Sequence, residues 1–239
     1  PGFRRVVFLS YRNSLPGSGA IKPLQMTKLK IAVQKSGRLF DDSQALLKEC
    51  GISICNGQDQ LVAQASNVSL EVLYLRNADI PYYVEDGSVD RAIIGENTVL
   101  ERQARVRKLT DLGFSSCRVS IAIPKNETFT DLNDLQGKRI ATSYPNTLRN
   151  FLVAHGIEAE VHLISGSVEI APNMGLADAI CDIVSSGSTL FKNGLKEVYC
   201  LFHSTAVLVA NNSLIREKRE LVEQLIFRIE AVLAAQRCK

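Results

Sequence analysis

The sequence predicts a soluble α/β protein of two lobes, each with a mixed or parallel sheet flanked by helices. From residue 28 onward, strand-like and helix-like patterns alternate, which is typical of parallel sheets with helices on both faces. The chain has 239 residues, of which 46% are hydrophobic, and this is sufficient for a large core. About sixteen expected elements are too many for one small sheet, so two lobes are expected.

The first half of the chain consists of strands that are each followed by a helix. Residues 28–34 alternate apolar side chains with lysines, which indicates a strand. Asp41 or Asp42 is expected to cap a helix that ends near Gly51. The remaining expected elements of this half are a strand at 70–75, a helix with Asp79 as its N-cap, Pro81 in its first turn and Gly87 at its exit, a strand at 92–94 and a helix at 96–102.

The second half repeats this alternation. Pro145 opens an expected helix with an apolar face. The last element, 213–237, is expected to be a long helix whose apolar stripe packs on its own lobe. Strands are expected at 118–123, 138–142, 161–164 and 179–184.

The segment 1–25 is treated separately from the fold. It contains four basic residues and no acidic ones, whereas a strand pattern follows Met26 directly. We interpret it as a disordered segment that is either non-native sequence or a leader. The remainder is divided into a first lobe of residues 26–112 plus 200–239 and a second lobe of residues 113–199.

Charge and cysteine content exclude several classes of protein. The formal charge is +3, but residues 26–239 hold 24 basic and 25 acidic residues, so no bulk basic bias points to nucleic acid. No apolar run approaches the roughly 18 residues of a membrane-spanning helix. The six cysteines form no C-x-x-C pair. Buried free thiols in the cytoplasm explain them better than disulfides or a zinc site.

The stretch 182–190 is the most informative. An apolar strand that contains Asp182 runs into small hydroxyl residues and Gly187, and a helix starts at Ser188 or Thr189. Backbone N–H groups at a helix start, together with Ser and Thr hydroxyls, suit a phosphate monoester. An ordinary strand–turn–helix capped by serine is the alternative.

Three further groups lie near expected strand ends. Lys35, Gly37 and Arg38 follow the first strand, where open α/β sheets bind ligands, and two cations beside a glycine suit a polyphosphate. Glu169, Asp178 and Asp182 are carboxylates that together can hold Mg²⁺ with substrate oxygens. Thr142 and Tyr144 precede the Pro145 helix, where the tyrosine either stacks on a base or packs in the core. No Ser, Cys or Thr has a credible partner histidine for covalent catalysis.

These motifs occur in an order that resembles the catalytic core of the ATP phosphoribosyltransferases. The resemblance covers about nine-tenths of the chain, from Met26 onward, and its last segment is highly specific. The matching segments are QKSGRL at 34–39, LRNADIP at 75–81, IIGEN at 93–97, KRIATSYP at 138–145 and GSVEIAPNMGLADAICDIVSSGSTL at 166–190.

The resemblance implies two α/β lobes similar to type II periplasmic binding proteins, with the active site between them. It implies transfer of phosphoribosyl from phosphoribosyl pyrophosphate to N1 of ATP, with Mg²⁺ as cofactor, in the first step of histidine biosynthesis. The implied catalytic residues are Lys35, Arg38, Glu169 and Asp182. The implied ligands of phosphoribosyl pyrophosphate are Glu169, Asp182, Ser185, Ser186, Gly187, Ser188 and Thr189. Those of ATP are Lys35, Gly37, Arg38, Arg76, Asp79, Thr142 and Tyr144, and those of the metal are Glu169, Asp178 and Asp182.

The sequence also departs from the family pattern. Arg91 stands where the family usually has leucine, and an arginine that the family has near Gln60 is absent. We interpret the chain as a long form without its C-terminal regulatory domain, and a short form that works with a regulatory partner is the alternative. The resemblance also implies a homo-oligomer, either a dimer or a hexamer built of dimers. A non-catalytic two-lobed small-molecule-binding domain remains the alternative of a different class.

Overall fold

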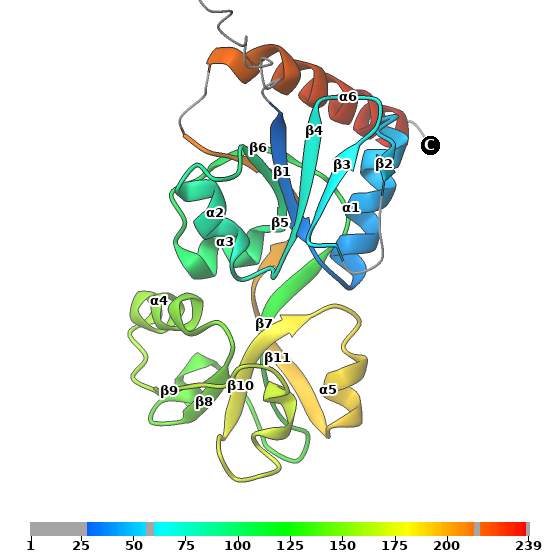
Figure 1. Cartoon of the computed structure of the whole chain (residues 1–239). Coiled ribbons are helices and arrows are strands. Elements are labelled where there is room, and N and C mark those ends of the chain that lie inside the picture. Colours follow the sequence, from blue (N-terminus) through cyan, green and yellow to red (C-terminus); the bar gives the residue numbers. More distant parts are fainter. Residues whose placement is uncertain (1–27, 56–59, 213–215, 238–239) are drawn as a thin grey trace, which may run out of the picture.

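The computed structural model describes residues 28–55, 60–212 and 216–237, which form two lobes stacked in Figure 1. The upper lobe contains a seven-stranded sheet and the lower lobe a five-stranded sheet. Helices cover both faces of each sheet, so the expected two-lobed α/β class is confirmed. The predicted leader, 1–25, lies outside the described residues.

The upper sheet is mixed, with the strand order β2-β3-β4-β1-β5-β12-β6. The strand β1 is parallel to β4 and β5, whereas the other strand pairs of this sheet are antiparallel. Leu29, Ile31 and Val33 of β1 pack in the core on one face of the sheet, and Ala32 packs in the core on the other face. The strands are β1 (Leu29–Gln34), β2 (Ile54–Cys55), β3 (Val62–Ala65), β4 (Leu70–Leu75), β5 (Arg91–Gly95), β6 (Arg107–Asp111) and β12 (Ala206–Ala210).

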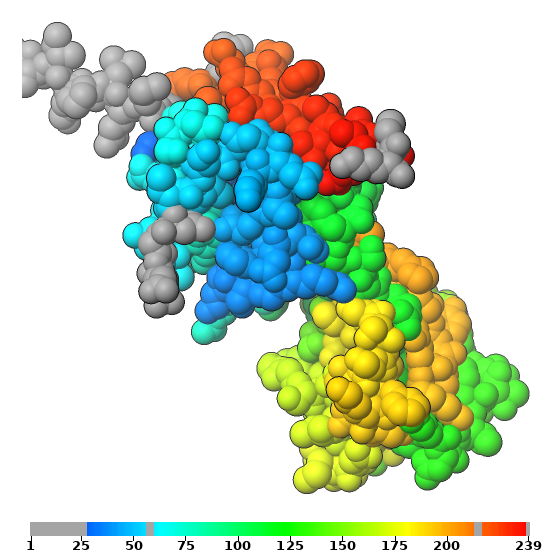
Figure 2. Space-filling model, turned by 90° about the vertical axis from the view of Figure 1, so that its right-hand side faces the viewer, coloured from blue at the N-terminus to red at the C-terminus, as the bar shows by residue number. Residues whose placement is uncertain are grey.

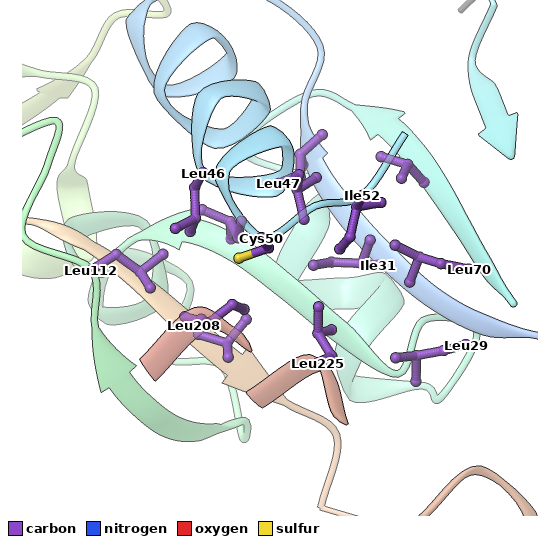
Figure 3. Close-up of a cluster of buried hydrophobic side chains, with 14 of the residues drawn as sticks. Leu29, Ile31, Leu46, Leu47, Cys50, Ile52, Leu70, Leu112, Leu208 and Leu225 are labelled. Atoms are coloured by element: carbon purple, nitrogen blue, oxygen red, sulfur yellow. The ribbon is translucent and has the colours of Figure 1, made fainter. Parts of the chain in front are cut away.

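Two helices pack on each face of this sheet. The helices α1 (Arg38–Glu49) and α6 (Arg219–Arg237) cover one face, and α2 (Ile80–Glu85) and α3 (Glu96–Arg102) cover the other. Figure 3 shows the first core, where Leu47 of α1, Ile31 of β1 and Leu225 of α6 converge. Each such side chain contributes about 1.5–3 kcal/mol by burial.

The lower sheet has the strand order β11-β7-β10-β8-β9. The strands β8, β9 and β10 are parallel, whereas β7 is antiparallel to both of its neighbours. The helix α4 packs on one face and α5 on the other. The elements are β7 (Cys117–Pro124), β8 (Arg139–Thr142), β9 (Glu160–Leu163), β10 (Ala179–Val184), β11 (Leu195–Ser204), α4 (Pro145–His155), α5 (Ser188–Lys192) and the short 3₁₀ turns Leu132–Leu135, Val168–Ile170 and Arg216–Lys218.

The chain crosses between the lobes twice, and the two crossings are hydrogen-bonded to each other. The N–H of Leu112 donates to Ala206 O at 2.9 Å, and the N–H of Ala206 donates to Phe114 O at 3.0 Å. The expected return at residue 200 falls inside β11, which stays paired with β7 as far as Ser204. The return therefore lies at Thr205.

The expected cap of the first helix is wrong. The helix α1 begins at Arg38 with Gly37 as its N-cap, and Asp41 lies in its first turn. Gly37 has φ 85°, a conformation that glycine adopts without strain, and it turns the chain directly from β1 into the helix. Asp42 instead accepts a hydrogen bond from Ser115 Oγ at 2.6 Å.

The last helix is shorter than expected. It begins at Arg219 after a 3₁₀ turn, and it buries Val222, Leu225, Ile229 and Leu233 on the sheet. Residues 213–215, where the helix was expected to start, lie outside the described residues. Among the described residues, no helix is long and apolar enough to cross a membrane.

Candidate active site

The loops that follow β1 and β4 lie at the edge of the upper sheet that faces the lower lobe. Because β1 and β4 are parallel, their C-terminal ends meet at one edge, and the N–H of Lys35 donates to Leu75 O at 2.9 Å. Lys35, Arg38 and Arg76 are exposed there. The structure thus brings the expected cationic loop to the boundary between the lobes.

The predicted phosphate loop follows β10 in the lower lobe. Gly187 has φ 79° and is the N-cap of α5, which begins at Ser188 as expected. Ser186 Oγ accepts from the Ser188 N–H at 3.3 Å and donates to Ser188 Oγ at 3.0 Å. The left-handed glycine and the helix start create the backbone geometry that binds anions in proteins.

Glu169 and Asp182 line the same pocket as this loop. The pocket has a volume of about 140 Å³ and is lined by Glu169, Asp182, Ile183, Val184, Ser185, Ser186, Gly187, Thr189 and Leu190. The 3₁₀ turn Val168–Ile170 carries Glu169 to the pocket, and Asp182 projects from β10. The structure therefore places the two carboxylates and the loop, which are separated in sequence, in one pocket.

Asp182 is a half-buried carboxylate with two hydrogen-bond donors around it. Its Oδ1 accepts from Ser143 Oγ at 2.9 Å and from the Ile183 N–H at 2.8 Å. Burial raises the pKa of Asp182 above its ordinary value, and the nearby negative charge of Glu169 raises it further, although the two hydrogen bonds oppose this shift. A cation or hydroxyl donor in the pocket would stabilise the charged form.

Arg38 reaches across the boundary to the phosphate loop. Its Nη2 donates to Ser116 O at 2.9 Å and to Ser185 Oγ at 3.2 Å. In Figure 2 the blue segment that contains the start of α1 lies against the yellow segment of the lower lobe. The guanidinium is thus fixed beside the pocket without any acidic partner among the described contacts, so its positive charge is available to an anion.

Asp178 is not brought to this group. It lies just before β10, at the opposite end of that strand from Ser185, and its Oδ1 accepts from Arg139 Nη2 at 2.8 Å. Hydrogen bonds from Arg139 lower the pKa of Asp178 to about 2. The expected grouping of three carboxylates around a metal is therefore not what the structure shows, because four residues along a strand span about 13 Å.

Thr142 and Tyr144 are packed into the boundary between the lobes. Thr142 is fully buried, and its Oγ1 accepts from the Tyr144 N–H at 2.8 Å. The Tyr144 hydroxyl accepts from Asn97 Nδ2 of the upper lobe at 2.8 Å. Burial raises the pKa of Tyr144 well above its ordinary value. Neither residue lines the pocket of Glu169 and Asp182, and Thr142 is not open to a ligand.

Arg76 and Asp79 lie apart from the phosphate pocket. Asp79 is the N-cap of α2 without a side-chain cap hydrogen bond, and it lines a separate groove of about 430 Å³ with Tyr82, Tyr83 and Arg102. Arg76 is exposed in the loop that precedes α2.

Sequence reasoning missed two residues at the boundary. Glu101 of α3 is buried, and its carboxylate accepts from the N–H groups of Asn146 and Thr147 at 3.1 and 2.9 Å. It therefore caps α4 of the other lobe. Nothing in the local sequence marks this role, since Glu101 lies within an ordinary helical pattern.

The second missed residue is Arg118, at the start of β7. It donates from Nη1 to Ser185 O at 3.1 Å and pairs with Glu197 of β11. A charged residue inside an expected strand was the available signal.

The residues present fit a magnesium site completed by a ligand. No group of three or more His, Cys, Asp or Glu side chains among the described residues could hold a metal. Glu169 and Asp182 share a pocket, however, and Mg²⁺ in proteins is usually bound by one or two carboxylates plus substrate phosphates and water.

The fold and the pocket define a two-lobed α/β protein with a candidate site for a phosphorylated ligand at the boundary between its lobes. Residues 76–231 match the ATP phosphoribosyltransferase family. The chain is 53% identical over 213 residues to an ATP phosphoribosyltransferase of Cytophaga hutchinsonii, covering 89% of this chain and 74% of that protein. The chain belongs to the ATP phosphoribosyltransferase family.

Solved structures agree with this assignment. A chain of the ATP phosphoribosyl transferase (HisG:HisZ) complex from Thermotoga maritima aligns with a TM-score of 0.75 and 28% identity, over 87% of this chain and 99% of that chain. The substrate-binding protein of an amino acid ABC transporter aligns with a TM-score of 0.57 and 13% identity, over 88% and 95%. The second likeness shows the fold alone, and it confirms the expected similarity to periplasmic binding proteins.

Proposed function

We propose that this chain transfers the phosphoribosyl group of phosphoribosyl pyrophosphate to N1 of ATP. The products are N1-(5-phosphoribosyl)-ATP and pyrophosphate, and the reaction is the first step of histidine biosynthesis. The observation that carries this proposal, beside membership of the family, is the meeting of Arg38 from one lobe with the Ser185 loop and the Glu169–Asp182 pair of the other.

The pocket is matched to phosphoribosyl pyrophosphate. The backbone and hydroxyls of the Ser185–Thr189 loop bind the 5′-phosphate in this proposal, because a glycine-containing turn at a helix start favours a phosphate. Glu169 and Asp182 accept hydrogen bonds from the ribose hydroxyls. Lys35 and Arg38 approach from the other lobe and neutralise the pyrophosphate.

The chemistry requires orientation and charge neutralisation more than a strong base. The lone pair of adenine N1 forms a bond to C1 of the ribose while the bond from C1 to the pyrophosphate oxygen breaks, and both electrons of that bond leave with pyrophosphate. Positive charge develops on the ribose and negative charge on the leaving group. The carboxylates stabilise the first and the cations the second, which is electrostatic stabilisation by preorganised groups.

Mg²⁺ is the proposed cofactor, with Glu169 and Asp182 as its protein ligands. When bound, the ion neutralises the charge of the pyrophosphate oxygens. Asp178 has no part in this proposal, since it is paired with Arg139.

ATP is proposed to bind along the upper-lobe side of the boundary. Lys35, Gly37 and Arg38 suit its phosphates, and Arg76 and Asp79 follow the neighbouring strand end. Thr142 and Tyr144 act indirectly in this proposal, because Thr142 holds the Tyr144 backbone and the Tyr144 hydroxyl is bound to Asn97 of the upper lobe. We also propose a cytoplasmic location, for which the free thiols of Cys50 and Cys181 in the core give support.

A homo-oligomer, either a dimer or a hexamer built of dimers, is proposed from the family. A regulatory partner is the alternative proposal, because the solved relative comes from a HisG:HisZ complex. Sedimentation velocity of the purified chain, alone and with added candidate partner, distinguishes these assemblies.

The proposal is tested by mixing the chain with ATP, phosphoribosyl pyrophosphate and Mg²⁺. Release of pyrophosphate and a new absorbance near the adenine band are expected, and the Ser188→Asp variant should lose both, because its carboxylate repels the 5′-phosphate. The matched control is Ser53→Asp, an exposed serine after α1. Saturable binding without turnover favours the non-catalytic binding domain instead, whereas absence of both binding and product contradicts the proposal.

A further inference from the structure

Arg118 holds the first peptide of the phosphate loop from outside the pocket. It lies on β7 beside the end of β10, where Val184 is its register partner. Its Nη1 donates to Ser185 O at 3.1 Å. Arg118 is not among the described residues that line the pocket with Glu169 and Asp182. Its contact with a ligand there is therefore indirect, through the loop.

A carboxylate on the next strand fixes the guanidinium in place. Arg118 Nε donates to Glu197 Oε1 at 2.6 Å and Nη2 donates to Glu197 Oε2 at 2.5 Å, so the pair is bidentate. Ser120 Oγ also donates to Glu197 Oε1 at 2.8 Å. A bidentate arginine–carboxylate pair with a third donor has one preferred orientation. The third nitrogen of the guanidinium, Nη1, is consequently directed at the Ser185 carbonyl oxygen.

This contact sets the direction of the loop's backbone groups. The described chain contains no cis peptide bond, so the Ser185 carbonyl and the Ser186 N–H point in opposite directions. With the carbonyl oxygen bound to Arg118, the Ser186 N–H is directed away from Arg118. If the peptide turned over, the loop would instead present a carbonyl oxygen to an anion, which would repel it.

We propose that Arg118, oriented by Glu197, is a positioning residue for phosphoribosyl pyrophosphate: it fixes the Ser185–Ser186 peptide in the orientation that binds the 5′-phosphate. This inference rests on the proposed function, because it names a residue that acts on the substrate of that reaction through the loop. The proposal gives the partly exposed Arg118–Glu197 ion pair of the lower sheet a role in substrate binding in addition to a structural one.

Two simpler roles make different predictions. If Arg118 acted only as a positive charge near an anionic substrate, removing the negative charge of Glu197 would tighten binding of phosphoribosyl pyrophosphate. If the pair acted only in stability, its loss would lower the melting temperature and leave substrate binding unchanged. Positioning predicts that Glu197→Gln weakens binding, because the guanidinium loses its bidentate partner.

The experiment measures the dissociation constant of phosphoribosyl pyrophosphate by calorimetry, and KM and kcat for both substrates, with the full chain. The variants are Arg118→Met, Arg118→Lys and Glu197→Gln. The matched control is Arg139→Met, because Arg139 begins β8 of the same sheet and has the same arrangement at the strand ends opposite the phosphate loop. It pairs with Asp178 at 2.8 Å and donates to the Gly175 carbonyl at 2.9 Å.

We expect Arg118→Met and Glu197→Gln to raise the KM and the dissociation constant for phosphoribosyl pyrophosphate by about 10- to 100-fold, a range typical of misplaced binding groups. The KM for ATP stays within about twofold, as for a residue remote from that substrate. Arg118→Lys rescues only part of the loss, because one ammonium cannot pair with Glu197 and bind the Ser185 carbonyl in the same fixed geometry. Arg139→Met changes stability alone.

Full rescue by Arg118→Lys, or tighter binding by Glu197→Gln, overturns the inference in favour of a charge effect. Equal KM changes for both substrates, or changes equal to those of Arg139→Met, overturn it in favour of a purely structural role. If the wild-type chain itself neither binds phosphoribosyl pyrophosphate nor releases pyrophosphate, the proposed function fails first and the inference fails with it.

Discussion

Arg38 Nη2 lies 3.2 Å from Ser185 Oγ, although the two residues are 147 positions apart in the chain and belong to different lobes. The same nitrogen donates to Ser116 O in the segment that connects the lobes. One guanidinium from the upper lobe's first helix thus contacts both the connecting segment and the phosphate loop. Both lobes therefore determine the geometry of the candidate site.

Replacing Arg38 with methionine is expected to lower kcat/KM for phosphoribosyl pyrophosphate by about 10²–10³-fold, because a preorganised charge facing the leaving group is lost. Steady-state pyrophosphate release measures this. The control is Arg219→Met on α6, which removes an arginine whose side chain is 72% exposed. A double-mutant cycle with Ser185→Ala should give less than additive losses, since the two side chains share a contact. Additive losses would show that they act independently.

Glu101 connects the lobes on the other side of the boundary by capping α4. Its carboxylate accepts from two first-turn amides of that helix, where the helix dipole also favours negative charge. In Glu101→Gln the negative charge is lost and one of the two amides faces an NH₂ donor in place of an acceptor oxygen, so the free energy of unfolding should fall by about 1–3 kcal/mol. Urea denaturation measures the change. Glu230→Gln, at an exposed position of α6, should stay within about 0.5 kcal/mol, and an equal loss there would refute the capping role.

The charged Asp182 side chain is expected to lower the free energy of unfolding at neutral pH, although the proposed reaction requires it. Burial raises its pKa in the folded chain above the ordinary value of 3.8. The folded state therefore holds a proton at pH values where the unfolded state has lost it, and stability falls as the pH rises through this window. Asp182→Asn should consequently raise the free energy of unfolding at pH 7, with the gain vanishing below pH 3.8.

The same substitution should lower kcat/KM by about 10²-fold, because the ribose loses an oriented charged acceptor. Denaturation curves between pH 3 and 7 and turnover assays test the two halves separately. A variant that is less stable than wild type at neutral pH would contradict the assignment of burial as the dominant effect on Asp182.

Asp178 should behave in the opposite way. Its pKa is lowered to about 2 by hydrogen bonds from Arg139, so its contribution to stability is present above the ordinary value of 3.8 and is lost as the pH falls toward 2. Because the pair is about one-third exposed, with side-chain exposures of 40% and 35%, Asp178→Asn should cost less than about 1 kcal/mol. The Mg²⁺ concentration for half-maximal turnover should not change, whereas Glu169→Gln should raise it. A shifted Mg²⁺ dependence in Asp178→Asn would restore this residue to the metal site.

Local pattern was sufficient for much of the fold. The strand β10 and the helix α3 have the expected bounds, because a continuous apolar run and a helical segment after Gly95 are both readable within one short window. The strands β11 and β12 were not assigned in advance. Their pairing is decided by partners far away in sequence, since β12 returns to the upper sheet between β5 and β6.

In the candidate site, too, features within one short segment could be predicted, whereas contacts between distant segments could not. The loop at Ser185 and its neighbour Asp182 could be predicted, because one strand end carries both. The contact of Arg38 with Ser185 could not, because it joins residues of different lobes. Asp178 was grouped with Asp182 in one metal site. An extended strand rises about 3.3 Å per residue, so these two residues lie too far apart along the chain to bind one metal ion.

The guanidinium of Arg91 is buried without enough hydrogen-bond partners among the described residues, so its replacement is expected to stabilise the protein. Only 2% of the residue is exposed, and within the described part of the chain its Nε and Nη2 have no hydrogen-bond partner. Its Nη1 donates to Asp90 O at 2.6 Å. The Asp90 carboxylate is already bound to Lys218 Nζ at 2.7 Å and to the Lys30 N–H at 2.8 Å. Burial accordingly lowers the pKa of Arg91.

Arg91→Leu should therefore raise the free energy of unfolding by about 1–4 kcal/mol, because an apolar side chain of the sheet replaces a poorly paired buried charge. Urea denaturation measures the gain, and Arg219→Leu at an exposed site should change stability by no more than about 0.5 kcal/mol. Turnover should be unchanged, because Arg91 begins β5 and the active-site boundary lies beyond Gly95 at its other end. A lower free energy of unfolding in Arg91→Leu would contradict this prediction. It would mean that the guanidinium has a stabilising partner beyond its hydrogen bonds to the described residues.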